Sequence, residues 1–132
     1  MANPVLPRVH AMVVCDDVVE SDQESGVFHL TGVRTVIDAP SFPTVHSLCV
    51  FAQMTGHPGE ADCRVEIECA QTAEVIGETD PQTVGFEDPT MVVPVLYRFP
   101  SCVFATPGLY FIQMYHESKQ IGERRLDLRS EE

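Results

Sequence analysis

A run of alternating apolar residues starts directly after a proline–glycine pair, and this run restricts the fold more than any other part of the chain. Pro107 fixes its own φ angle and Gly108 accepts the dihedral angles of a tight corner, so the chain can reverse there. Beyond the corner, Tyr110, Ile112 and Met114 recur at every second residue, which is the side-chain period of a β-strand. The pattern predicts a strand whose Tyr110 face points into an apolar core.

The residues that follow predict a terminal hairpin. Residues 117–120 are polar enough to form a turn, and Leu126 and Leu128 then share one face of a returning strand. A tyrosine just inside such a strand resembles the corner tyrosine of immunoglobulin-like sandwiches, whose hydroxyl bonds to nearby backbone. This resemblance implies structural roles for Pro107, Gly108 and Tyr110.

The rest of the sequence favours short strands over helices. Ten prolines and eight glycines are spread through 132 residues, and no segment has the 3.6-residue apolar period of an amphipathic helix. Further strands are expected at residues 9–15, 26–37, 44–55, 61–71, 74–78 and 91–97. We therefore expect an all-β fold, a single-domain antiparallel β-sandwich of about seven to eight strands over residues 1–132, immunoglobulin-like or related.

Several segments are expected to lie outside this regular framework. Residues 72–91 contain two Asp-Pro pairs and two glycines, which predict an irregular connection. The prolines at 40 and 43 predict a crossing between sheets, and Pro94 predicts an edge strand or a bulge. The ends, residues 1–7 and 129–132, are expected to fray.

The charge balance restricts the partners of the chain. Eight Lys and Arg residues against 20 Asp and Glu residues give a net charge of −12, which repels phosphate backbones and anionic membrane surfaces. We expect neither nucleic acid nor a membrane as partner. The first eight residues lack the apolar segment of a secretory signal, which predicts a cytoplasmic protein. The five cysteines are scattered and odd in number, which predicts buried free thiols.

The densest acidic segment, residues 16–24, is expected to form a loop and is the strongest metal candidate. Asp16, Asp17 and Asp22 could supply the oxygen ligands that Ca²⁺ prefers, although their spacing is not that of an EF-hand. A solvated acidic turn is the simpler interpretation. No other cofactor is expected.

Signals for catalysis are weak. The chain has no Gly-x-Ser-x-Gly elbow, phosphate loop or dinucleotide fingerprint. A nucleophilic Cys102 would need His116 beside it, and a histidine metal site would need His29 and His46 to meet across paired strands. We therefore expect that the protein is not an enzyme.

Four motifs together resemble a family of small uncharacterised bacterial or phage domains of unknown function. They are Cys15-Asp16-Asp17, the G-x-x-x-L-x-G-V strand at residues 26–33, Phe42-Pro43-Thr44 and Pro107-Gly108-x-Tyr110. The resemblance spans most of the chain. It implies a β-sandwich without an established activity, and it supplies no catalytic or binding residues.

Two kinds of function remain. The favoured hypothesis is a non-enzymatic protein-interaction or structural accessory module, which contacts a protein partner or a second copy through loops or a sheet edge, at the Pro94 strand or residues 72–91. The alternative is a sandwich that binds carbohydrate or Ca²⁺ through the acidic loop 16–24. Because the chain has no Trp, a carbohydrate site would have to use Tyr97, Phe111 or Tyr115.

Overall fold

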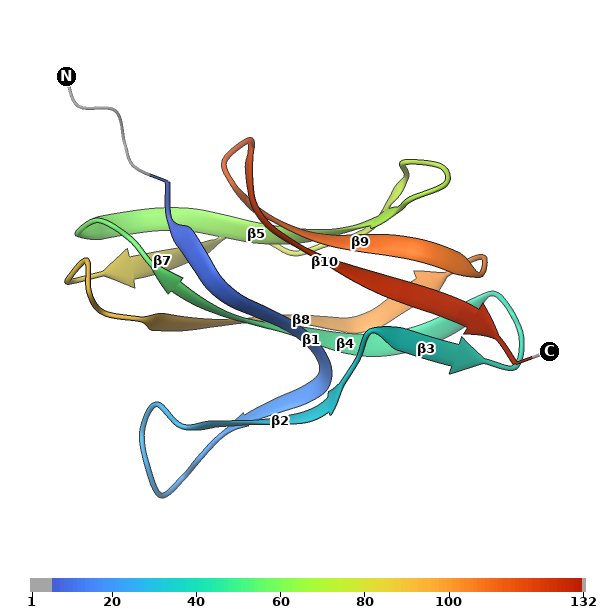
Figure 1. Cartoon of the computed structure of the whole chain (residues 1–132), viewed down its shortest axis with the longest axis horizontal. Coiled ribbons are helices and arrows are strands. Elements are labelled where there is room, and N and C mark those ends of the chain that lie inside the picture. The colour runs from blue at the N-terminus through green and yellow to red at the C-terminus, as the bar shows by residue number, and fades with distance from the viewer. Residues whose placement is uncertain (1–5, 132) are drawn as a thin grey trace.

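The computed structural model describes residues 6–131, which form ten β-strands in two layers (Figure 1). In chain order the strands are β1 (Arg8–Glu20), β2 (Phe28–Val33), β3 (Val36–Ala39), β4 (Thr44–Thr55), β5 (Gly59–Cys69), β6 (Val75–Glu78), β7 (Gln82–Phe86), β8 (Val93–Phe104), β9 (Gly108–His116) and β10 (Lys119–Ser130). The predicted all-β sandwich is confirmed, with ten strands in place of seven to eight. Within this range no helix is long and apolar enough to span a membrane.

The strands pair into a four-stranded and a six-stranded sheet. The first has the order β2-β1-β4-β8, and the second has the order β3-β10-β9-β5, with β6 and β7 both paired to β5. Among the described pairs only β3 and β10 run parallel; the others are antiparallel, as predicted. The core lies between the two sheets.

Period-two burial accounts for the core. Each long strand turns alternate apolar side chains inward, and the six-stranded sheet shows the pattern clearly on β5 and β9. The inward residues of these two strands, all buried, are Cys63, Val65, Ile67, Cys69, Tyr110, Ile112 and Met114. The buried face predicted for the Tyr110 strand is therefore confirmed.

The predicted tyrosine corner is present before β9. The Tyr110 hydroxyl donates a 2.8 Å hydrogen bond to the carbonyl oxygen of Thr106, and the Tyr110 ring meets the Phe104 ring edge-on at 5.0 Å. Gly108 has a φ of +132°, which side chains rarely tolerate. Pro107, Gly108 and Tyr110 thus fix the entry of β9 into the core.

The predicted strand at residues 26–37 is divided between the two sheets. Its first part is β2 in the four-stranded sheet, and its second part is β3, which lies beside β10 in the other sheet. Gly32, with a φ of +65°, re-aims the chain just before the switch. Residues 40–43 then cross back to β4, and Phe42 packs against the core from that connection.

The structure corrects the predictions for three segments. The acidic residues 16–20 are not a loop, because Val18 and Val19 continue β1 and pair with β2. Residues 72–91 are more regular than predicted, since they contain β7 as well as the expected β6. At the C-terminal end, residues 129 and 130 belong to β10 and pair with β3 instead of fraying. Residues 1–5 and 132 of the predicted frayed ends lie outside the described residues.

Replacing the corner tyrosine tests the energetic role assigned to it. Tyr110→Phe keeps the ring but removes the hydroxyl that bonds to Thr106, so the free energy of unfolding should fall by about 0.5–1.5 kcal/mol. Urea denaturation measures this change. Tyr115→Phe is the matched control, because its hydroxyl bonds to the Gln113 side chain on a half-buried surface. Equal stability of Tyr110→Phe and the parent protein would show that the corner bond contributes nothing.

Candidate functional site

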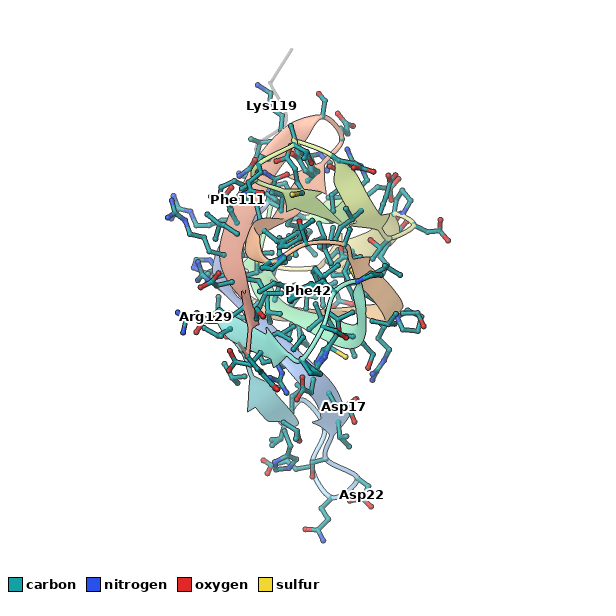
Figure 2. The ribbon with its side chains drawn as sticks, turned by 90° about the vertical axis from the view of Figure 1, so that its right-hand side faces the viewer. Asp17, Asp22, Phe42, Phe111, Lys119 and Arg129 are labelled. Carbon is teal, nitrogen blue, oxygen red and sulfur yellow. The ribbon has the colours of Figure 1, made fainter. Side chains whose placement is uncertain are left out.

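The candidate site is the hairpin formed by the end of β1 and by β2. After Cys15 the chain no longer pairs with β4, and residues 16–33 project beyond the sandwich as an arm (Figure 1). Figure 2 shows Asp22 at the far end of this arm and Asp17 nearer the sandwich. We call residues 16–33 the hairpin arm.

One side of the bend is held by the carboxylate of Asp16. Arg34 donates two hydrogen bonds to it, from Nε to Oδ1 at 2.5 Å and from Nη2 to Oδ2 at 2.9 Å, and His46 Nε2 lies 3.3 Å from Oδ1. The hydrogen bonds from Arg34 lower the pKa of Asp16 below its ordinary value. A Cβ atom on Gly32 would lie 2.2 Å from Asp16 Oδ2, so only glycine leaves room for this carboxylate.

The other side of the bend is held by Arg98 of β8. Its Nη1 donates to Asp17 Oδ1 at 3.0 Å and to Cys49 Sγ at 3.4 Å, and its Nη2 donates to the carbonyl oxygen of Val18 at 3.1 Å. The hydrogen bond from Arg98 lowers the pKa of Asp17. A single arginine therefore ties the opposite edge strand of the sheet to the base of the hairpin arm.

A small apolar cluster packs the hairpin arm against the outer face of the four-stranded sheet. Its buried members are Cys15, Val18, Cys49 and Phe51, and Phe28, Leu30 and Leu96 pack against them. The rings of Phe28 and Phe51 are 5.1 Å apart. This contact fixes the direction of the arm, because both of its strands contribute side chains to the cluster.

The two edges of the four-stranded sheet differ in their protection. On β8, Pro94 and Pro100 have no N–H to offer, and the side chain of Gln82 donates to the carbonyl oxygen of Leu96 at 2.8 Å. The predicted edge position of the Pro94 strand is confirmed. β2, at the other edge, has no proline or lysine and pairs with β1 alone.

The free edge of β2 presents unpaired backbone groups. Ser21 N–H donates to the carbonyl oxygen of Val27 at 2.7 Å, so the groups of Val27 face β1. Because backbone groups alternate in direction along a strand, those of Phe28 and Leu30 face outward. The backbone N–H and C=O groups of these two residues therefore form the accessible edge of the hairpin arm.

The predicted Ca²⁺ ligands are not brought together by the fold. Asp16 and Asp17 lie on opposite sides of the bend and each accepts hydrogen bonds from an arginine, whereas Asp22 is exposed at the tip. Residues 6–131 contain no group of three or more His, Cys, Asp or Glu side chains that could hold a metal ion. Binding of Ca²⁺ therefore stays a prediction without a preformed site to support it.

The other candidate side chains are also separated or covered. β1 lies between β2 and β4, so the strands of His29 and His46 are not paired, and the approach that a histidine metal site would need is not made. Cys102 is buried in the core, and this burial raises its pKa to about 11, which disfavours the nucleophilic thiolate. His116 instead places Nδ1 at 2.9 Å from the carbonyl oxygen of Asp62. All five cysteines are free and buried, as predicted.

The aromatic residues considered for carbohydrate do not form an open platform. Tyr97 is buried and donates its hydroxyl to the carbonyl oxygen of Cys63. Tyr115 and Phe111 lie on the outer face of the six-stranded sheet, but guanidinium groups lie over both rings, Arg64 at 4.6 Å and Arg125 at 5.9 Å. The face of each ring is therefore occupied by a cation.

Sequence reasoning missed Arg34, His46 and Arg98, the partners of the two aspartates. They are 18, 30 and 81 residues from the aspartate that each contacts. One signal in the sequence could have indicated these contacts. The chain has only eight Lys and Arg residues for 20 Asp and Glu residues, so each arginine is a candidate partner for a carboxylate.

Acid titration tests the role of the Asp16 ion pair. Since the pKa of Asp16 is lower in the folded protein, its contribution to stability is present above the unfolded pKa of about 3.9 and is lost as the pH falls through the folded value. The melting temperature of Asp16→Asn should be below that of the parent at pH 7, and the difference should shrink below about pH 4. Asp22→Asn, at the exposed tip, is the matched control. A difference that stays constant down to pH 2 would contradict the assignment.

Comparisons with solved structures support the fold. The chain resembles an alkylpurine DNA glycosylase of Pseudomonas fluorescens bound to DNA containing an abasic site analogue, with a TM-score of 0.56 and 9% identity over 93% of this chain and 30% of that chain. It also resembles a β-glucosidase of Listeria innocua, with a TM-score of 0.53 and 11% identity over 73% of this chain and 15% of that chain. The chain thus spans less than a third of either protein, and the likeness shows the fold alone.

An immunoglobulin-like protein of Pseudomonas aeruginosa matches 97% of this chain and its own full length, at 13% identity and a TM-score of 0.46. No curated protein matches the chain. The sequence profile described as "Family of unknown function (DUF6941)" matches residues 10–129. The resemblance to an uncharacterised β-sandwich family is therefore confirmed, and the chain belongs to the Family of unknown function (DUF6941).

Proposed function

We propose that the protein is a non-enzymatic interaction module that binds a protein partner by strand addition to β2. The observation that carries this proposal is the unprotected edge of β2 within the projecting hairpin arm. A partner strand would pair with the outward backbone groups of Phe28 and Leu30 and extend the four-stranded sheet. The affinity would come from these main-chain hydrogen bonds.

The contrast with the other edges supports the choice of β2. β8 is blunted by its prolines and by Gln82, and β3 is only four residues long. The edge formed by β6 and β7 is interrupted at Asp80-Pro81. Natural sheets protect their edges in these ways against unwanted pairing, so an edge without such protection is a candidate interface.

The hairpin arm is also held firmly enough to present a strand. Arg34 and Arg98 fix its base, and the contact of Phe28 with Phe51 fixes its direction. A strand held in place loses less conformational entropy on binding than a mobile segment does. The arm is therefore prepared for pairing.

The charge of the tip indicates the kind of partner. Glu20 ends β1, Asp22 and Glu24 belong to the connection from β1 to β2, and Figure 2 shows Asp22 at the far end of the arm. A partner strand with Lys or Arg at the corresponding end would approach with favourable electrostatics. A second copy of this chain would bring a further net charge of −12, which opposes self-association.

Two lysines on β2 test the proposal. His29→Lys/Thr31→Lys replaces two exposed side chains of β2 with lysine. Natural edge strands carry lysine to prevent pairing with other strands, so partner binding should be lost. Affinity capture from host lysate, followed by size-exclusion chromatography with light scattering of the complex, measures the loss.

Val45→Lys/Val103→Lys is the matched control, because it places two lysines on an exposed cross-strand pair of β4 and β8 in the same sheet. This control should retain the partner. The proposal is wrong if the β2 variant captures the same partner as the parent and the control do. It is also wrong if the parent protein stays monomeric and captures nothing.

A further inference from the structure

The cations of this acidic chain are distributed unevenly. Arg34, Arg64, Arg98 and Arg129 each lie within 4.0 Å of an Asp or Glu oxygen. The other four, Arg8, Lys119, Arg124 and Arg125, have no carboxylate of residues 6–131 within that distance. All four belong to β1 or β10.

β1 and β10 border the same open side of the sandwich (Figure 1). Residues 8–13 of β1 pair only with β4, and residues 119–126 of β10 pair only with β9, so neither strand pairs with a further strand over this length. Arg124 bridges the two sheets, because its Nε donates to the carbonyl oxygen of Met12 at 2.7 Å. Figure 2 shows Lys119 and Arg129 at opposite ends of β10 along this side.

A groove lies at the middle of the open side. It is lined by apolar residues of β1 and by Val33, and by the two adjacent arginines Arg124 and Arg125. Val33 is 64% exposed. Arg34 and Thr35 of the crossing from β2 to β3 line the remainder.

The charge at this groove is positive although the molecule is acidic. Arg34 is paired with Asp16, whereas neither Arg124 nor Arg125 forms an ion pair with an Asp or Glu of residues 6–131. Arg125 and Glu123 share the outer face of the six-stranded sheet, where Arg125 lies over the Phe111 ring, whereas Arg124 is on the other face of β10. Arg124 uses Nε for Met12 and Nη1 for the carbonyl oxygen of Glu123, which leaves Nη2 free for an acceptor.

We propose that this groove binds an extended acidic segment of a partner protein in which carboxylate and aliphatic residues alternate. A carboxylate in the groove would accept a hydrogen bond from Arg124, and a neighbouring carboxylate at the rim would be attracted by Arg125, whose guanidinium lies over Phe111. The aliphatic side chains, on the other face of the segment, would lie against Val13 and Val33. The proposal does not depend on the use of the β2 edge.

Fluorescence anisotropy with a labelled peptide of alternating glutamate and valine tests the groove. The ionic strength should be about 0.15 M, where the Debye length of about 8 Å screens repulsion by distant carboxylates. The parent protein should bind this peptide and should not bind a peptide of alternating lysine and valine. Arg124→Gln/Arg125→Gln should weaken binding of the glutamate peptide by about tenfold.

Three further variants keep the test specific. Arg64→Gln removes an arginine of β5 that is paired with Glu66, and it should bind the glutamate peptide as the parent does. His29→Lys/Thr31→Lys should also leave this binding unchanged. Arg124→Glu/Arg125→Glu should lose the glutamate peptide and gain the lysine peptide, a result that a misfolded protein would not give.

The proposal is overturned if the parent does not bind the glutamate peptide, or if Arg124→Gln/Arg125→Gln binds it as tightly as the parent. Loss of this binding in His29→Lys/Thr31→Lys would place the peptide on the β2 edge and would also overturn the proposal.

Discussion

The contact between Asp16, Gly32 and Arg34 sets the course of the chain between the two sheets. Asp16 ends the part of β1 that pairs with β4, and its carboxylate occupies the space that a side chain at position 32 would need. The same carboxylate binds Arg34, the first residue after β2. Beyond this point the chain joins the six-stranded sheet as β3. The hairpin arm and the groove of Arg124 and Arg125 lie on either side of this switch, so both depend on it.

The ion pairs and the apolar contacts contribute differently to the hairpin arm. The side chains of Asp16 and Arg34 are about a third exposed, and pairs of this kind contribute up to about 1 kcal/mol. Full burial of a Phe or Leu side chain contributes about 1.5–3 kcal/mol, and Phe28 and Leu30 are half-buried in their cluster. Packing therefore holds the arm against the sheet, whereas the charged contacts decide the direction in which the chain leaves the bend.

The sequence predicted those features that follow from local periodicity. The alternation in β4, β5 and β9 identified these strands and, in β9, the buried face, and Pro107-Gly108 identified the corner before β9. The acidic segment was misread, because five acidic residues outweighed Val18 and Val19 in a local reading, although pairing with β2 makes those residues a strand. The site could not be predicted, since its contacts join residues as far apart as Asp17 and Arg98. No periodicity indicates which arginine a given aspartate will meet once the sheets have formed.

Net charge and edge protection act together in this fold. A sheet with a free edge can pair with another copy of itself, and most natural sheets prevent this by blocking the edge. Here β8 is blocked and Arg124 bridges the facing edges of β1 and β10, but β2 is open. The net charge of −12 supplies a second protection, because two copies repel each other before their edges can meet. An open edge on a strongly acidic molecule is thus protected from its own copies and remains available to a partner whose charges complement the surface around that edge.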